Sequence, residues 1–233
     1  MSVNNIDISS LIDRILYEDN HLIIINKLPS EIVQGDKTGD SPLSDSIKKY
    51  LIWKYNKPGE AFLGTVHRLD RPVSGALVYA KTSKALTRMN QQIKDGNLTK
   101  VYHAIVAKLP PKESDLLEHW LIKNEKQNKS YISNSKTSGA KLAKLKYKVL
   151  KSIDNYHLIE IELLTGRHHQ IRVQLSEIGC IIKGDLKYGA PRSNKNASIS
   201  LHARTISFIH PVSKLVISIF APYPTDDIWE KFE

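Results

Sequence analysis

The amino-acid sequence predicts an α+β fold in a single domain that spans residues 1–233. Three observations support this prediction. Short apolar or alternating runs, which are typical of strands, outnumber the runs with helical periodicity. Most neighbouring runs are separated by few residues, which favours antiparallel pairing. The 233 residues contain no fixed-period repeat, no low-complexity tract and no evident linker, and this length suits one large domain.

In the first half of the chain we expect strands at 21–26, 62–66 and 76–80, and helices at 42–55 and 83–95. The first strand is a β-branched run that ends in a Lys-Leu-Pro-Ser turn. The first helix has Ser41 as a candidate N-cap, Pro42 in its first turn and apolar residues at four-residue spacing. The next two strands flank a bend that contains proline and glycine. The second helix starts at a Thr82 or Ser83 cap and stops at Gly96.

In the second half we expect strands at 100–107, 144–149, 157–163, 201–209 and 215–220, and one helix at 167–178. The strand at 144–149 alternates strictly. It presents a cationic face of Lys144, Lys146 and Lys148 to solvent and an apolar face to the core. In the helix, apolar residues fall at i, i+4 and i+7, and Gly179 closes it.

The chain is strongly basic, with 34 Lys and Arg against 24 Asp and Glu, a net charge of +10 and a pI near 9.5. Such a surface attracts polyanions, of which nucleic acid is the commonest. A merely basic, soluble protein is the alternative. We find no signal peptide, and the apolar runs are too short to cross a bilayer. Cys180 is the only cysteine, so no internal disulfide can form. We therefore expect a cytoplasmic protein with no membrane partner.

Several classes of site are absent from the sequence. It has neither a G-x-x-x-x-G-K-[ST] nor a G-x-G-x-x-G motif, which argues against a nucleotide-phosphate cradle. His168 and His169 are adjacent, so we expect their rings to point in different directions, and metal binding is not indicated. Ser74 lacks the first glycine of a nucleophile elbow, which argues against a serine hydrolase.

The segment H67-R-L-D-R-P-V-S-G75 places Asp70 between two arginines, at a bend that precedes an apolar run. Taken alone, such an aspartate is more often a satisfied turn carboxylate than a catalyst. Two further segments stand out: T99-K-V-Y-H-A-I-V106 and L164-T-G-R-H-H-Q-I-R172, the second of which continues to Gly189.

Together these three segments resemble the motifs of the RluA-type pseudouridine synthases, which convert uridine in RNA to its C-glycoside isomer. The entry segment I-L-Y-E-D-N-H-L-I-I-I-N-K27 and the late segment L201-H-A-R-T-I-S-F-I-H-P211 match as well. The resemblance covers about residues 14–220. It implies a mixed, largely antiparallel central sheet flanked by helices, with a central RNA-binding cleft. It also implies a minimal, catalytic-domain-only member without an N-terminal accessory RNA-binding domain.

The reaction suits the residues in these segments. Isomerising uridine requires an ionised carboxylate near the sugar–base bond, but neither a redox cofactor nor a group donor. The resemblance assigns that role to Asp70, and assigns Arg172 as the cation that keeps it charged. Tyr102 would stack on the extruded uracil and exchange a proton late in the reaction. Arg68 would lie near the gap that the flipped base vacates.

The remaining residues that we assign to RNA binding are His67, Arg71, Arg167, His168, Lys144, Lys146 and Lys148. The three lysines belong to a run of nine between residues 123 and 151 that contains one acid, Glu125. We expect a transfer or ribosomal RNA stem-loop as partner, no small-molecule cofactor, no metal, and a monomer.

Each residue also has a plainer interpretation. Arg172 could be an exposed helix residue, Tyr102 a core aromatic and the lysine run a solvated face. Lys27 and the Lys183-Gly184-Asp185 segment are expected to be structural. Where the family commonly has threonine, histidine and a K-P-x-G turn, this chain has Val73, Gln174 and Lys27-Leu-Pro-Ser-Glu.

Two rival functions remain. A non-catalytic RNA-binding protein could retain the fold, but it would be expected to lose Asp70, Tyr102 or Arg172. A nucleoside glycosidase would want a second carboxylate, and the three segments, with the last taken as far as Arg172, contain no acidic residue other than Asp70.

Overall fold

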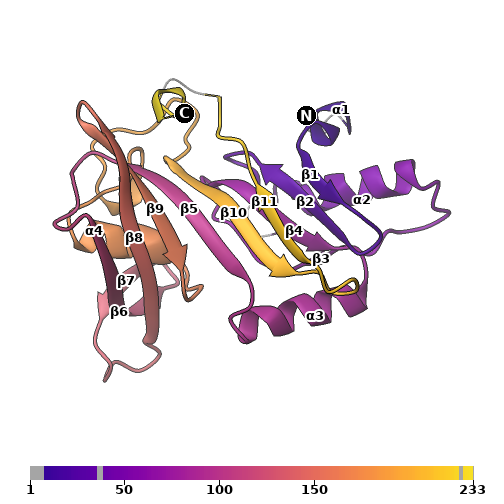
Figure 1. The fold of residues 1–233 in the computed structure, drawn as a ribbon, viewed down its shortest axis with the longest axis horizontal. Coiled ribbons are helices and arrows are strands. Elements are labelled where there is room, and N and C mark those ends of the chain that lie inside the picture. The colour runs from indigo at the N-terminus through magenta and orange to yellow at the C-terminus, as the bar shows by residue number, and fades with distance from the viewer. Residues whose placement is uncertain (1–7, 36–38, 226–227, 233) are drawn as a thin grey trace. The chain divides into compact units, whose positions relative to one another are not determined.

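The computed structural model describes residues 8–35, 39–225 and 228–232, and the chain divides into two compact units (Figure 1). The first unit comprises Met1–Leu98 and Thr205–Pro222. The second unit comprises Thr99–Arg204 and Tyr223–Glu233. Strand β10 contributes residues to both units. The single domain expected from the sequence stays a prediction.

In the described part of the first unit, each of the three helices is followed by two strands of that unit. They are α1 (Ile8–Ile12), β1 (Ile15–Glu18), β2 (Leu22–Lys27), α2 (Leu43–Lys54), β3 (Gly64–Thr65), β4 (Ser74–Ala80), α3 (Ser83–Lys94), the second part of β10 (Leu201–Ile209) and β11 (Val216–Phe220). The strand order is β1-β2-β4-β10, with β3 paired to β4 and β11 paired to β10. The pairs β1–β2, β2–β4, β3–β4 and β10–β11 are antiparallel.

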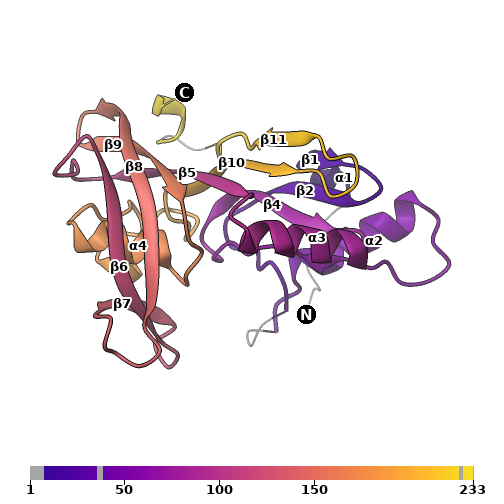
Figure 2. The same cartoon turned by 60° about the horizontal axis from the view of Figure 1, so that its bottom comes forward.

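The core of the first unit forms around β4, in which every residue is buried. The β2–β4 register pairs Leu22 with Ala80 and Lys27 with Gly75, so the end of β2 lies beside the start of β4. Helices α2 and α3 lie on one side of this sheet (Figure 2). Helix α3 buries Ala85 and Met89 in the same core.

The helix starts follow the predictions in one case and depart from them in the other. The Oγ1 of Thr82 accepts a hydrogen bond from the Ala85 amide at 3.2 Å, which confirms a hydroxyl cap for α3. At α2 the N-cap residue is Pro42, and no side chain caps the helix. The expected Ser41 cap is therefore wrong, because the chain becomes helical only after the proline.

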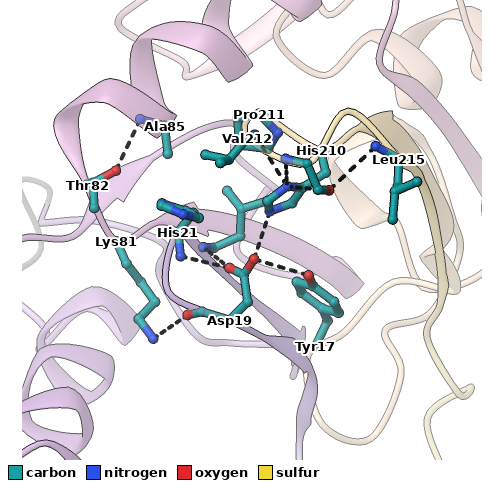
Figure 3. A network of polar contacts seen from close by, with 12 residues as sticks. Tyr17, Asp19, His21, Lys81, Thr82, Ala85, His210, Pro211, Val212 and Leu215 are labelled. Carbon is teal, nitrogen blue, oxygen red and sulfur yellow. Dashed lines mark hydrogen bonds and ion pairs between the residues drawn. The ribbon is translucent and has the colours of Figure 1, made fainter.

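Asp19 joins the turn between β1 and β2 to the turn between β10 and β11 (Figure 3). Its Oδ1 accepts hydrogen bonds from the amides of His21 and Leu22 at 2.8 and 2.7 Å, and its Oδ2 lies 2.7 Å from the Nε2 of His210. Burial acts to raise the pKa of Asp19, but these contacts and the Tyr17 hydroxyl outweigh it, so the pKa is lowered. The aspartate is a structural hub of the first unit.

The second unit is a sheet of long antiparallel strands packed against one helix. Its elements are β5 (Thr99–Val106), β6 (Ser114–Asn124), β7 (Lys129–Ser133), β8 (Lys141–Ile153), β9 (Tyr156–Leu163), α4 (Gln170–Glu177) and the 3-10 turns η1 (Leu186–Tyr188) and η2 (Glu230–Phe232). The strand order is β5-β9-β8-β6-β7. Val173 of α4 packs with Leu121, Ala143 and Tyr188, and a second cluster joins Ile105 and Leu158 to Trp229 and Phe232.

These elements confirm the predicted α+β class, and all the expected strands and helices are present. The strand expected at 62–66 is reduced to Gly64–Thr65, and α4 begins at Gln170 instead of 167. Elements α1, β1, β6 and β7 were not predicted. No helix in the described ranges is long and apolar enough to span a membrane.

Candidate active site

Asp70 lies at the bend between β3 and β4, in the first unit. Its backbone carbonyl accepts a hydrogen bond from the Val73 amide at 3.0 Å, which closes a turn over Arg71 and Pro72. Val73 is buried, with 2% of its surface exposed, so an apolar side chain suits the position where the family commonly has threonine. Gly75 follows at a φ of 115°, a conformation that favours glycine. The Asp70 side chain itself is partly exposed.

The side chain of Lys27 is hydrogen-bonded to the backbone of this bend. Its ammonium group is fully buried and donates hydrogen bonds to the carbonyls of Leu28, Arg71 and Val73 at 2.9, 3.1 and 2.7 Å. Burial lowers the pKa of Lys27 to about 7, although the charges of Glu31 and Asp70 act in the opposite direction. Lys27 therefore holds the backbone on the C-terminal side of Asp70, which agrees with the structural role expected for it.

The other polar residues of the bend differ in their contacts. The Nε2 of His67 accepts a hydrogen bond from the Val78 amide at 3.2 Å, which ties His67 to β4. The Nη1 of Arg71 pairs with Asp40 at 2.7 Å, and both side chains are about half exposed. Arg68 is exposed. Because His67 is bonded to β4 and Arg71 is paired with Asp40, Arg68 is the most available of the three to a ligand.

Tyr102 and Arg172 lie in the second unit. Tyr102 is 6% exposed, on β5. Arg172 is also buried, and its guanidinium binds Asp185 through two hydrogen bonds, from Nε at 2.7 Å and from Nη2 at 2.8 Å. The guanidinium carbon lies 5.1 Å from the centre of the Tyr188 ring. The interpretation of Arg172 as an exposed helix residue is wrong, because residues 170–175 of α4 are all buried.

The loop before α4 is closed by Gln170. Its Oε1 accepts hydrogen bonds from the Thr165 hydroxyl at 2.8 Å and from the Arg167 amide at 3.0 Å, and its Nε2 donates to the Lys144 carbonyl at 3.0 Å. The Nε of Arg167 donates to the Leu142 carbonyl at 3.0 Å. These bonds fix Arg167 at the edge of β8.

The rings of His168 and His169 are stacked, with centroids 3.8 Å apart and an interplanar angle of 19°. The expectation that they point in different directions is wrong, because His169 has a left-handed φ of 52° that turns its ring beside its neighbour. Burial lowers the pKa of His169 to about 2, and the Arg172 charge adds to this effect. His168 contacts Ser130 and Asn128 at 2.8 and 3.1 Å.

The predicted cationic face of β8 is in fact a face of mixed charge. The Nζ of Lys144 lies 2.6 Å from Glu118, and that of Lys146 lies 3.6 Å from Glu162. Lys148 stands opposite Glu160 in the β8–β9 register. Glu118 comes from β6, a strand that was not predicted, and Glu160 and Glu162 come from β9. The sequence signal for the β9 acids was their alternation within the predicted strand at 157–163.

The structure thus places Asp70, His67, Arg68 and Arg71 in the first unit, and every other predicted site residue in the second. The pairing of Asp70 with Arg172 stays a prediction. Asp185 was expected only to organise a loop, and its bond to Arg172 was missed. The described residues contain no group of three or more His, Cys, Asp or Glu side chains that could hold a metal ion.

Residues 21–177 match the family model described as RNA pseudouridylate synthase. The chain belongs to this family. This match confirms the resemblance seen in the sequence. It assigns the protein to the RNA pseudouridine synthases, which are isomerases.

Curated relatives share about a third of the sequence. The ribosomal large subunit pseudouridine synthase C of Buchnera aphidicola subsp. Acyrthosiphon pisum is 33% identical over 225 residues, which cover 94% of this chain and 69% of the relative. The synthase C of Rickettsia prowazekii is 39% identical over 180 residues, which cover 77% of this chain and 57% of the relative. The fold is similar to that of human RNA pseudouridylate synthase domain containing 4, with a TM-score of 0.82 and 23% sequence identity. The match covers 95% of this chain and 92% of the human chain.

Proposed function

We propose that the protein converts one or more uridines in a structured transfer or ribosomal RNA to pseudouridine, with Asp70 as the essential carboxylate. The bond between the sugar C1′ and the base N1 breaks, and a bond from C1′ to C5 forms. C5 loses its proton and N1 gains one, so the reaction needs no oxidant, reductant or group donor.

The observation that carries this proposal is the construction of the Asp70 bend. The Val73 amide and the Lys27 ammonium fix the backbone of the turn, while the carboxylate keeps partial access to solvent. A carboxylate held in this way is suited to attack the sugar or to act as a base. Asp70 also lies within the segment that matches the family.

Arg172 is the cation that we propose for Asp70. Asp185 takes two of the five N–H donors of its guanidinium, and we propose that the others serve the Asp70 carboxylate. Such contacts would keep the carboxylate ionised when bound RNA excludes water from it.

The uridine reaches this site by leaving its base stack, because a paired base cannot approach a recessed carboxylate. We propose that Tyr102 stacks on the extruded uracil and that Arg68 occupies the vacated position. The exposed guanidinium of Arg68 can stack on a base and also bind phosphate.

The RNA backbone would be bound by the basic surface. We propose phosphate contacts for Arg71, Arg167 and His168, and for the β8 lysines 144, 146 and 148, on a chain whose net charge is +10. We also propose that the enzyme acts as a cytoplasmic monomer. Sedimentation of the purified protein would check its oligomeric state.

The test of the proposed function uses RNA that carries tritium at C5 of uracil. Isomerisation releases this label to water, so the wild type should release it and Asp70→Asn should lose activity by several orders of magnitude. Asp45→Asn, an exposed aspartate of α2 in the same unit, is the matched control and should remain active. An Asp70→Asn variant as active as the wild type would refute the role of Asp70.

The RNA target is found by mapping pseudouridine in transfer and ribosomal RNA from cells with and without the gene. One or a few sites should disappear in its absence. Wild-type protein that binds RNA but releases no label from it would favour the rival function, a non-catalytic RNA-binding protein.

A further inference from the structure

Lys100 lies two residues before Tyr102 on β5, so the two side chains project from the same face of the strand. Their Cα atoms are separated by about 7 Å along a strand. The Lys100 ammonium lies beside the loop that precedes α4: a Cβ built on Gly166 would be 3.4 Å from Nζ. The absence of a side chain at residue 166 therefore leaves open space next to this charge.

The Lys100 ammonium forms no hydrogen bond or ion pair with any residue in the described part of the chain. Burial therefore lowers the pKa of Lys100, because the protein removes water from the ammonium charge without supplying an anion to pair with it. Lysines that are mostly buried are usually paired. A desolvated and unpaired ammonium is costly to the free protein, and an anionic ligand would remove that cost.

The adjacent loop offers further donors. Gly166 is exposed, and its amide has no acceptor within the described ranges. The side chain of Arg167 is exposed beyond its Nε bond to Leu142. Meanwhile the amides of Leu164 and Thr165 both donate to the Lys144 carbonyl, at 3.1 and 3.2 Å, so the loop is anchored to β8.

We propose that Lys100, the Gly166 amide and Arg167 form a binding site for one phosphate of the RNA backbone, next to the nucleotide that Tyr102 receives. The inference rests on the proposed function. An ammonium, an amide and a guanidinium can surround a phosphate and satisfy its oxygens. The site fixes the sugar–phosphate chain beside the extruded base, which makes Lys100 a positioning residue.

Glycine at 166 has a specific role in this arrangement. A methyl group there would lie close to the Lys100 ammonium and would occupy the space that a phosphate oxygen needs. Gly166→Ala should therefore weaken RNA binding.

The test measures binding of short hairpin RNAs that contain the mapped uridine, in which one phosphate at a time is replaced by an uncharged methylphosphonate. All proteins carry Asp70→Asn, so that no turnover occurs during the measurement. Three variants are compared in this background: Lys100→Met, Lys100→Arg and the control Lys108→Met. Lys108 is matched because its exposed ammonium also lies near a glycine, 3.6 Å from a Cβ built on Gly179.

In the protein that retains Lys100, one linkage beside the uridine should lose about tenfold in affinity when its charge is removed. Lys100→Met should bind the unmodified hairpin about tenfold more weakly and should be insensitive to methylphosphonate at that linkage. Lys100→Arg should retain sensitivity, as should Lys108→Met.

The inference is wrong if Lys100→Met shows the same linkage profile as the parent, even when its overall affinity has fallen. Because each profile is internal to one variant, partial unfolding lowers all affinities equally and leaves the comparison valid. A wild type that releases no tritium would refute the proposed function alone, since these measurements report binding without chemistry.

Discussion

At the residue scale, the second unit buries an arginine and an aspartate against each other. The side chains of Arg172 and Asp185 are 5% and 1% exposed and are joined by two parallel hydrogen bonds. Such a pair contributes little net stability, but breaking it leaves an uncompensated buried charge. The two bonds fix the plane of the guanidinium that we propose as the partner of Asp70.

Asp185→Asn should therefore lower the free energy of unfolding by about 3–5 kcal/mol. Chemical denaturation at pH 7 measures this change. The matched comparison is Glu162→Gln, which removes one member of the exposed 3.6 Å pair with Lys146 and should cost under about 1 kcal/mol. Equal effects of the two substitutions would contradict the view that burial sets the cost.

Lys27→Met should destabilise the fold by roughly 1–3 kcal/mol, because three carbonyls lose their donor. The effect should depend on pH. The pKa of Lys27 is about 7 in the folded protein and 10.5 ordinarily, so between these values the unfolded state binds the extra proton. Stability of the wild type therefore gains a component that rises with pH over this window and that Lys27→Met lacks.

Denaturation series at pH 7, 8 and 9 would check the Lys27 prediction. Lys84→Met, which replaces an exposed lysine of α3, is the control and should leave the pH dependence unchanged. If the difference in the free energy of unfolding between wild type and Lys27→Met stays constant from pH 7 to 9, the pKa of Lys27 is not lowered in the folded state.

At the element scale, the predictions succeeded where apolar periodicity and caps coincided, and failed where charge concealed the pattern. Helix α3 has a Thr82 cap and a glycine stop, and both could be identified from the sequence. Strands β6 and β7 were missed because they lie in or beside the lysine-rich run, which suggested a solvated surface. The start of α4 was placed three residues early, since the left-handed φ of His169 has no sequence signal comparable to glycine.

Glu18 shows how one side chain can hold several elements. It ends β1 and accepts hydrogen bonds from Tyr50, Lys54 and Tyr55, on and just after α2, and from Lys81, which follows β4. Burial acts to raise the pKa of Glu18, but the four donors outweigh it and lower the pKa from 4.5 to about 2.

Because the folded pKa is depressed, the stabilisation from Glu18 is complete above pH 4.5 and is lost as the pH falls toward 2. Glu18→Gln should cost roughly 1–3 kcal/mol at pH 7 and should flatten the acid limb of the stability profile. Thermal unfolding between pH 2.5 and 7 measures both effects. An acid limb as steep in the variant as in the wild type would exclude Glu18 as its source.

At the scale of the whole molecule, the sequence predicted the fold class and family, because several motifs recur in a specific order along most of the chain. It did not predict the division into two units. That division depends on contacts between distant segments, such as Trp229 with Ile105 and Leu158, which no local pattern reveals. Nor does the net charge of +10 indicate where acids neutralise the basic residues.

The β8 lysines test how far this charge reflects RNA binding. Replacing Lys144, Lys146 and Lys148 by Gln together should weaken RNA binding and lower the slope of log affinity against log salt by up to about 2. Partial neutralisation by Glu118 and Glu162 should keep the change below the limit for three free lysines. A titration of hairpin RNA from low to moderate salt measures the slope, and an unchanged slope would assign these lysines to the folded structure alone.

The segment Tyr223–Glu233 has a consequence for how the protein is made. Trp229 and Phe232 complete a cluster whose other members, Ile105 and Leu158, are synthesised more than seventy residues earlier. The first unit likewise includes the second part of β10 and all of β11, which are synthesised after most of the second unit. A ribosome adds residues in order, so the first unit cannot finish folding before β11 has been synthesised, and the second cannot finish before Phe232 has been synthesised. Nascent chains stalled before residue 229 should therefore remain sensitive to protease, however complete their earlier strands.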